Sequence, residues 1–298
     1  MNEPQFSIII PHHDAPIQLQ RLLESVPWML QPEVIVVDDV STDENRQAAK
    51  ACAEASGAQW YEVCRHTAGA ARNEGLRHAL GQWLVFADAD DYFTPQARTL
   101  LQEMAGADAD IIYFNVISAW SDSGRPAYRD RQVKRLIERC HREHSLMPLA
   151  ALHTNPWGKM IRRSLVEEEG IRFEEIAAAN DAMFSVKTGI KARKRLLRDE
   201  AVYCITVDNR SMTSNMTAER FECHGQARLR VNAYLRQQGW GKYQLSVLSY
   251  LLPAWRYGWC YGWRVLKACC ADGNRPWVGL SRLLNPVDII HSLKSRPK

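Results

Sequence analysis

Three carboxylates stand within four residues, at Asp88, Asp90 and Asp91. They follow an apolar run from Trp83 to Ala87 that is typical of a short buried strand. Like charges this close repel unless a cation neutralises them, and carboxylate oxygens favour Mg²⁺ or Mn²⁺, which also bind phosphates. Open α/β sheets bind ligands at the carboxyl ends of their strands. The sequence therefore predicts a metal and phosphate site here, and the alternative is a solvated acidic turn.

Strands and helices are expected to alternate before and around this run. Besides the run itself, strands are predicted at 6–10, 33–37 and 58–63, and helices at 16–26, 41–56 and 69–81. A Ser-x-x-Glu pattern from Ser41 to Glu44 predicts a capping box for the second helix. This alternation is typical of a parallel, doubly wound α/β sheet, the kind of domain that binds nucleotides.

The composition is that of a folded protein, with 46% hydrophobic and 24% charged residues among 298. The eight cysteines form no Cys-x-x-Cys pair, which favours free thiols in a reducing cytoplasm and argues against a zinc site. No basic region of a signal peptide precedes the run from Phe6 to Ile10. No Gly-x-Gly-x-x-Gly pattern follows a strand, so a dinucleotide enzyme is not expected.

The end of the chain differs from the rest in charge and in aromatic content. From Arg220 onward there are 13 lysines and arginines against 3 acidic residues, whereas the whole chain has a net charge of +4. A helix is predicted at 221–237, and residues 245–263 are rich in tryptophan and tyrosine. Pro253 and several glycines argue against a membrane-spanning helix. The segment is expected to lie at a bilayer interface or to pack as a helical subdomain on the rest of the protein.

Segments at 7–11, 36–43, 71–75 and 86–91 together resemble glycosyltransferase family 2, enzymes of the GT-A fold that use nucleotide-sugars. Later segments fit the acceptor-side half of the same family: 157–159, 170–173, 180–184 and 203–213, the last with Arg210 and Ser211. The resemblance implies a catalytic domain at 1–218, with a Rossmann-like, mostly parallel sheet flanked by helices. A helical, basic and aromatic-rich region would follow at 219–298.

The resemblance implies donor-side roles for several residues. Asp90 would bind Mn²⁺ or Mg²⁺, and Asp88 would lie near both the metal and the ribose. Asp39 would accept a hydrogen bond from uracil, and Arg72 would hold the base or the phosphates. The nucleotide pocket would also be lined by Pro11 and Asp14.

Each of these roles has a structural alternative. Asp38 and Asp39 could cap a turn, and Arg72 could form an ion pair with a carboxylate of the same sheet edge. His12 and His13 stand where the family more often has other residues, and they are expected to be loop residues flanking the nucleotide rather than metal ligands. A late histidine, His224, could complete the metal shell.

On the acceptor side, the resemblance makes Asp181 the catalytic base. Asn180 precedes it where the family commonly has Glu, and losing that charge should lower the pKa of Asp181 relative to a paired arrangement. The alternative is that Asp181 caps the helix at 182–190. Trp157 could stack on an acceptor sugar or could belong to the core. Lys159 and Asn180 are further acceptor-side candidates.

The implied activity is inverting and metal-dependent. One hexosyl or N-acetylhexosaminyl unit would pass from a nucleotide-sugar, expected to be a UDP-sugar, to a hydroxyl of a growing surface glycan such as lipopolysaccharide or capsule. A single addition is expected because the Gln-x-x-Arg-Trp signature of processive members is missing. The expected partners are the nucleotide-sugar, a glycan or glycolipid acceptor and an anionic membrane surface, with no nucleic acid. The expected location is the cytoplasm, on the inner face of a bacterial plasma membrane.

Two other functions are left open. Haloacid-dehalogenase-type phosphatases also carry an Asp-x-Asp pair, but on the first strand of the domain rather than on roughly the fourth. The second alternative is a nucleotide-sugar-binding relative without catalysis, suggested only by Asn180.

Overall fold

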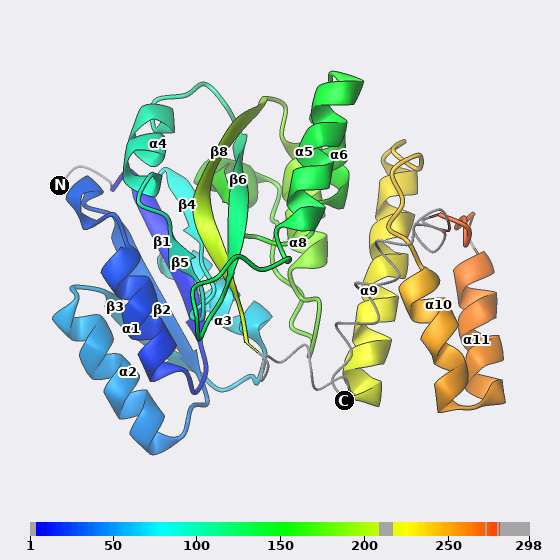
Figure 1. Cartoon of the computed structure of the whole chain (residues 1–298), viewed down its shortest axis with the longest axis horizontal. Helices are drawn as coiled ribbons and strands as arrows, with labels where there is room; N and C mark the ends of the chain where they lie inside the picture. Colours follow the sequence, from blue (N-terminus) through cyan, green and yellow to red (C-terminus); the bar gives the residue numbers. More distant parts are fainter. Residues whose placement is uncertain (1–3, 209–216, 272, 279, 281–298) are drawn as a thin grey trace. The chain divides into compact units, whose positions relative to one another are not determined.

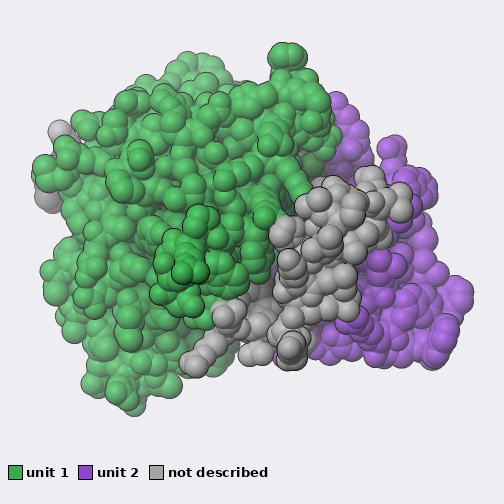
Figure 2. All heavy atoms as spheres, in the orientation of Figure 1, with its two compact units in different colours: residues 1–208 green, residues 209–298 purple. Residues whose placement is uncertain are grey.

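The computed structural model describes residues 4–208, 217–271, 273–278 and 280. The chain divides into two compact units, residues 1–208 and 209–298, which Figure 2 colours green and purple. The sequence places the boundary at 218 instead. Arg210 and Ser211, two residues of the predicted acceptor half, lie outside the described residues.

The first unit is built on an eight-stranded sheet with the order β3-β2-β1-β4-β7-β6-β8-β5. The strands predicted first occupy one half of it and are parallel: β1 (Phe6–His12), β2 (Glu33–Asp39), β3 (Gln59–Val63) and β4 (Trp83–Phe86). The middle of β1 and β2 consists of buried isoleucines and valines, as expected where helices cover both faces of a parallel sheet. Their carboxyl ends therefore meet at one edge.

The other half of the sheet is mixed. Its strands are β5 (Tyr92–Phe93), β6 (Ile111–Trp120), β7 (Lys159–Arg162) and β8 (Arg195–Val207). Strand β7 runs antiparallel to β4 and β6, whereas β8 runs parallel to β6 and antiparallel to β5. The carboxylates after β4 thus lie on a loop whose two ends belong to strands far apart in the sheet.

The helices of the first unit are α1 (Pro16–Ser25), α2 (Asp43–Ala55), α3 (Ala68–His78), α4 (Ala97–Met104), α5 (Arg131–Glu143), α6 (Met147–Leu152), α7 (Arg163–Glu168) and α8 (Ala182–Lys191), with a 3₁₀ turn η1 (Trp28–Leu30). Figure 1 shows α1 and α2 side by side, and α3 packs on β1 and β2. Gly75 allows this approach, because a Cβ there would lie 2.5 Å from Cγ2 of Ile9.

The predicted capping box at the start of α2 is wrong. The helix begins at Asp43 with Thr42 as its N-cap residue, and no side chain caps it. Ser41 instead donates its hydroxyl to Asp38 at the end of β2. The pattern correctly indicates that a helix begins here, but the buried carboxylate of Asp38 competes for the Ser41 hydroxyl.

The second unit is helical, with α9 (Ala218–Gln237), α10 (Leu248–Ala254), a 3₁₀ turn η2 (Trp255–Tyr257) and α11 (Trp259–Cys270). It has a small core of its own made by Phe221, Val247, Tyr250, Ala254, Val265 and Cys269. Within the described part of the chain, no helix has the length and apolar character needed to cross a membrane.

Candidate active site

The loop between β4 and β5 holds the three carboxylates in different environments. The Asp88 side chain is 31% exposed and Asp90 is exposed, but Asp91 is buried. Burial raises the pKa of Asp91 well above its usual range, and the charges of Asp90 and Asp88 add to this. Its carboxylate accepts a hydrogen bond from the backbone N–H of Thr206 at 2.7 Å. Asp91 therefore anchors the loop to β8, and Asp88 and Asp90 are left for ligands.

The backbone of Asp90 is fixed from two sides. Its carbonyl oxygen accepts hydrogen bonds from the Thr206 hydroxyl at 2.6 Å and from the Arg21 guanidinium of α1. Desolvation by the surrounding protein raises the pKa of the Asp90 carboxyl, and the charge of Asp88 raises it further. Two like charges are thus held close together on an ordered loop, where a cation would stabilise both.

The residues present fit a divalent cation of the Mg²⁺ type. Among the described residues, no three or more His, Cys, Asp and Glu side chains are grouped to hold a metal by themselves. Mg²⁺ commonly takes only one or two protein carboxylates and completes its shell with substrate phosphates and water. Asp88 and Asp90 supply that number of hard oxygen ligands.

Arg72 of α3 joins the carboxylate loop to the segment before α8. Its Nη2 lies 2.6 Å from Oδ1 of Asp88, and its Nη1 donates to Oδ1 of Asn180 at 2.9 Å. The guanidinium is buried and lies 5.4 Å from the centre of the Phe173 ring. The ion-pair alternative for Arg72 is therefore what the structure shows, while contact with base or phosphate stays a prediction. The side-chain oxygen of Asn180 thus serves as the hydrogen-bond acceptor for Arg72.

Asp181 stands at the N-cap position of α8, but its side chain caps no backbone N–H. Burial raises the pKa of the Asp181 carboxyl, the charge of Arg72 lowers it, and Asp88 raises it again. The net direction is upward and burial is its largest cause, while the predicted effect of Asn180, which compares Asp181 with a paired Glu-Asp arrangement, stays a prediction. A raised pKa suits a carboxylate that takes a proton from a hydroxyl.

Trp157 and Lys159 lie in the interior beneath this site. Lys159 is 1% exposed, and its Nζ donates to the carbonyl of His153 at 2.9 Å. Burial lowers the pKa of Lys159 to about 7. Trp157 is also buried and stacks on Tyr203 at 5.9 Å between ring centres. The structure thus favours the core alternative for Trp157, and Lys159 is buried against the backbone of His153.

Asp39 at the end of β2 holds the loop that leads into α3. Its carboxylate accepts hydrogen bonds from the backbone N–H groups of Arg65 (2.8 Å), His66 (2.9 Å) and Thr67. The turn-capping alternative is therefore observed. A carboxylate offers about four acceptor positions, so one remains for a further donor such as a nucleobase N–H.

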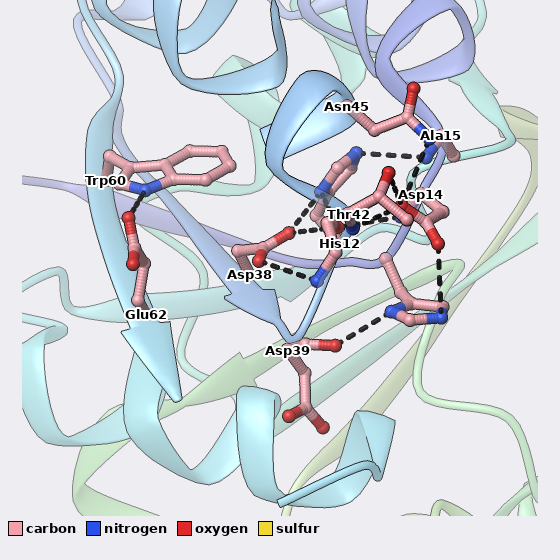
Figure 3. Close-up of polar contacts among 11 residues, drawn as sticks. His12, Asp14, Ala15, Asp38, Asp39, Thr42, Asn45, Trp60 and Glu62 are labelled. Carbon is pink, nitrogen blue, oxygen red and sulfur yellow. Dashed lines mark hydrogen bonds and ion pairs between the residues drawn. The ribbon is translucent and has the colours of Figure 1, made fainter. Parts of the chain in front are cut away.

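Figure 3 shows the neighbouring polar cluster, centred on Asp38. Nδ1 of the buried His12 lies 2.7 Å from Oδ1 of Asp38, and its Nε2 accepts from the backbone N–H of Ala15 at 3.2 Å. Both ring nitrogens of His12 are thus engaged within the protein, which argues against a role as a metal ligand. His13 is exposed, and its Nδ1 lies 2.8 Å from the carbonyl oxygen of Asp39.

Asp14 ties the loop after β1 to the start of α2. Its Oδ1 accepts from the backbone and hydroxyl of Thr42 and from Asn45 at 3.0 Å, and the Asn45 hydrogen bond is the largest cause that lowers the pKa of Asp14. Pro11 is half-buried on β1, paired with Val37 of β2. Both predicted pocket residues therefore lie at the carboxyl edge of the parallel strands, beside Asp39.

Three residues of this site were not predicted from the sequence: Arg21, Tyr203 and Thr206. The Tyr203 hydroxyl accepts a hydrogen bond from the backbone N–H of Asp88 at 2.8 Å, and the partners are 115 residues apart. Tyr203 lies in a segment that the family resemblance includes, but no local pattern assigns it this contact. His224 lies on α9 of the second unit, where burial and then the charges of Arg228 and Arg220 lower its pKa.

Comparison with known proteins gives consistent matches. The family model described as Glycosyl transferase family 2 matches residues 7–170. The EpsH protein of Bacillus subtilis (strain 168) is 24% identical over 248 residues, which cover 80% of this chain and 71% of EpsH. The poly(ribitol-phosphate) beta-N-acetylglucosaminyltransferase TarS of Staphylococcus aureus (strain Mu50) is 27% identical over 210 residues. That match covers 68% of this chain but only 35% of TarS.

Solved structures agree in fold. A crystal structure of S. aureus TarS residues 1–349 with UDP-GlcNAc has a TM-score of 0.63 at 19% identity, covering 96% of this chain and 77% of that one. The mannosyltransferase PcManGT from Pyrobaculum calidifontis, with GDP-Man and Mn²⁺, has a TM-score of 0.59 at 17% identity, covering 98% and 84%. At such identities the likeness concerns the fold, and it confirms the GT-A architecture with C-terminal helices.

Proposed function

Because the chain belongs to glycosyltransferase family 2, we propose that it transfers one sugar from a nucleotide-sugar to a hydroxyl group, with inversion at the anomeric carbon. The observation that carries this proposal is the double contact of Arg72. One guanidinium contacts Asp88 of the donor-side loop and Asn180, the neighbour of Asp181. Donor-side and acceptor-side carboxylates therefore meet at one edge of the sheet, as a direct displacement requires.

The chemistry assigns a separate task to each carboxylate. Sugar transfer passes through an oxocarbenium-like state while negative charge grows on the departing diphosphate. A divalent cation held by Asp88 and Asp90 would supply Lewis-acid stabilisation of that charge. Asp181 would accept the proton of the attacking hydroxyl, and the charge of Arg72, which lowers the pKa of Asp181, would favour its ionised form.

For the donor, we propose a UDP-hexose or UDP-N-acetylhexosamine. TarS was solved with UDP-GlcNAc and PcManGT with GDP-Man, so the shared fold accepts more than one nucleotide. Asp39 retains one acceptor position at the carboxyl edge, which suits the single imide N–H of uracil. Pro11 and Asp14 would border the same pocket.

For the acceptor, we propose a hydroxyl of a bacterial surface glycan carried on a lipid, such as lipopolysaccharide or capsule. The support is that TarS, a relative, is named for a cell-wall polymer, poly(ribitol phosphate). One addition per encounter is expected. The enzyme would then work in the cytoplasm at the inner face of the plasma membrane, and Asn180 and Lys159 would support Asp181 from within the protein.

The test is donor turnover by Asp90→Ala, measured as release of nucleoside diphosphate from a panel of UDP- and GDP-sugars with Mn²⁺ or Mg²⁺. Turnover should fall to background while circular dichroism stays that of the parent. Asp108→Ala is the matched control, because Asp108 is exposed and pairs with Lys194. Full turnover by Asp90→Ala contradicts the metal assignment. A parent protein that binds UDP but never releases it from a donor would be the non-catalytic relative.

A further inference from the structure

Helix α11 turns two tryptophans outward. Trp259 is 77% exposed and Trp263 is 53% exposed. The spacing of four residues places both on one helix face, and Lys267 continues that face by another four. The opposite face, with Gly262, Val265 and Cys269, is buried in the second unit.

The two indoles are held in a cluster rather than left loose. The ring of Trp255 lies 5.4 Å from that of Trp259 and 5.7 Å from that of Trp263, in edge-to-face geometry with both. Trp255 itself packs on Gly262, where a Cβ would lie 2.3 Å from its ring. The glycine thus provides the space that brings the three rings together.

The segment that carries the cluster has charges of one sign. Residues 240–271 contain four basic residues, Lys242, Arg256, Arg264 and Lys267, and no acidic one. Among the described residues, Glu222 of α9 contacts this region: it accepts hydrogen bonds from Tyr250 and Tyr261 and lies 3.7 Å from Arg264. Its charge is therefore already compensated. Arg256 and Lys267 are exposed beside the indoles.

We propose that this surface, made by Trp255, Trp259, Trp263, Arg256 and Lys267 and here called the indole patch, docks on an anionic lipid bilayer. Indole rings favour the headgroup region because they are apolar with one N–H that stays hydrated. Lysine and arginine next to them are attracted by anionic headgroups. A helix face with exposed rings and cations, in a stretch (240–271) that contains no acidic residue, fits a bilayer better than it fits the mixed-charge surface of a protein.

The proposal rests on the proposed function for one point: a lipid-carried acceptor would explain why the enzyme binds a membrane. The binding itself is measured without catalysis. The assay is flotation of the full chain with vesicles of phosphatidylglycerol and phosphatidylethanolamine, or of phosphatidylcholine alone. The parent should float with the anionic vesicles, should bind the neutral ones at least tenfold more weakly, and should be released by about 0.5 M NaCl.

Two double variants test the patch in the full chain. Trp259→Ser with Trp263→Ser should weaken binding by roughly tenfold or more, because each ring loses its apolar contact with the bilayer. Arg256→Gln with Lys267→Gln should weaken it about 30-fold at low salt, from about 1 kcal/mol for each charge. The matched controls replace exposed residues of the first unit: Met29→Ser with Leu80→Ser, and Lys50→Gln with Arg98→Gln. Both controls should bind as the parent does.

Release of nucleoside diphosphate in the absence of lipid separates the two proposals. The patch variants should keep this activity, whereas failure of the proposed function would remove it from the parent as well. Failure of the parent to float overturns the indole patch, as does parent-like binding by both patch variants or an equal loss in the controls. If the tryptophan variant does not fold, the charge variant, altered only at exposed side chains, decides alone.

Discussion

Replacing Arg72 tests the link between donor and acceptor sides most directly. Arg72→Met removes a charge-assisted hydrogen bond to Asp88 and one to Asn180. Such bonds contribute roughly 1.5–3 kcal/mol each, and the partial exposure of Asp88 lets water replace part of the first. We expect the free energy of unfolding to fall by about 3 kcal/mol. Arg72→Lys keeps the charge but not the two-pronged geometry, so about half that loss is expected.

The same pair of variants separates charge from packing in catalysis. The charge of Arg72 lowers the pKa of Asp181, which burial raises. Without that charge the pKa of Asp181 rises. Because the base must be ionised to act, the variant should lose activity, as the pH falls, at a higher pH than the parent does. The acid limb of the kcat profile should therefore move to higher pH in Arg72→Met and stay near the parent's position in Arg72→Lys.

The assays are urea unfolding at fixed pH and steady-state release of nucleoside diphosphate across pH 5 to 9. Arg77→Met is a suitable control, because Arg77 belongs to the same helix but is exposed and paired with Glu74. The reasoning is refuted if Arg72→Met unfolds like the parent, or if both Arg72 variants show the same acid limb. The second result would mean that Arg72 only positions the segment before α8.

Three further changes have defined outcomes. Asp181→Asn should lower kcat by roughly two to four orders of magnitude with donor affinity unchanged, and loss of affinity alone would contradict its role as base. Lys159→Met tests the buried amine, whose pKa of about 7 lies below its value in the unfolded chain. Keeping Lys159 buried therefore costs folding free energy wherever the unfolded chain carries its proton, below about pH 10.5. This cost shrinks as pH rises from 7 toward 10.5. The free energy of unfolding of the parent, minus that of Lys159→Met, should therefore increase by about 1.4 kcal/mol per pH unit between pH 7.5 and 9, as measured by urea titration. Gly75→Ala should cost about 1–3 kcal/mol, because its Cβ would lie 2.5 Å from Ile9, and an unchanged thermal midpoint would argue against the close packing of α3.

The first half of the fold could be predicted because its signals are local. Strands β1, β2 and β4 are short apolar runs, and polar residues lie at their carboxyl ends or follow within two positions. The position of Asp88 and Asp90 could be predicted for the same reason, since they follow closely on a strand, while their role as metal ligands stays a prediction. The role of Asp91 could not, because its burial depends on Thr206 from a distant strand.

The second half of the first unit could not be predicted in the same way, because its structure depends on contacts between residues far apart in the sequence. Trp157 and Lys159 were predicted on the acceptor side by resemblance, but β7 pairs Lys159 with Tyr113 of β6 and turns it inward. From the sequence, Asn180 stands where the family commonly has a glutamate. In the structure, its side-chain oxygen accepts a hydrogen bond from Arg72. The first outcome depends on strand register and the second on the packing of α3 against the segment before α8. Neither has a local signal when the partner is dozens of residues away or more.

The tethering of the carboxylate loop to β8 also sets an order for biosynthesis. Asp88 and Asp91 are held by Tyr203 and Thr206, about 115 positions further along the chain. On the ribosome, the parallel strands β1 to β4 can pair early, with Arg21 and Arg72 available to the loop that follows β4, but its contacts with Tyr203 and Thr206 form only after β8 has emerged. A nascent or prematurely ended chain thus lacks part of the hydrogen bonding that positions these carboxylates, and the loop is fully held only when nearly the whole first unit has been made.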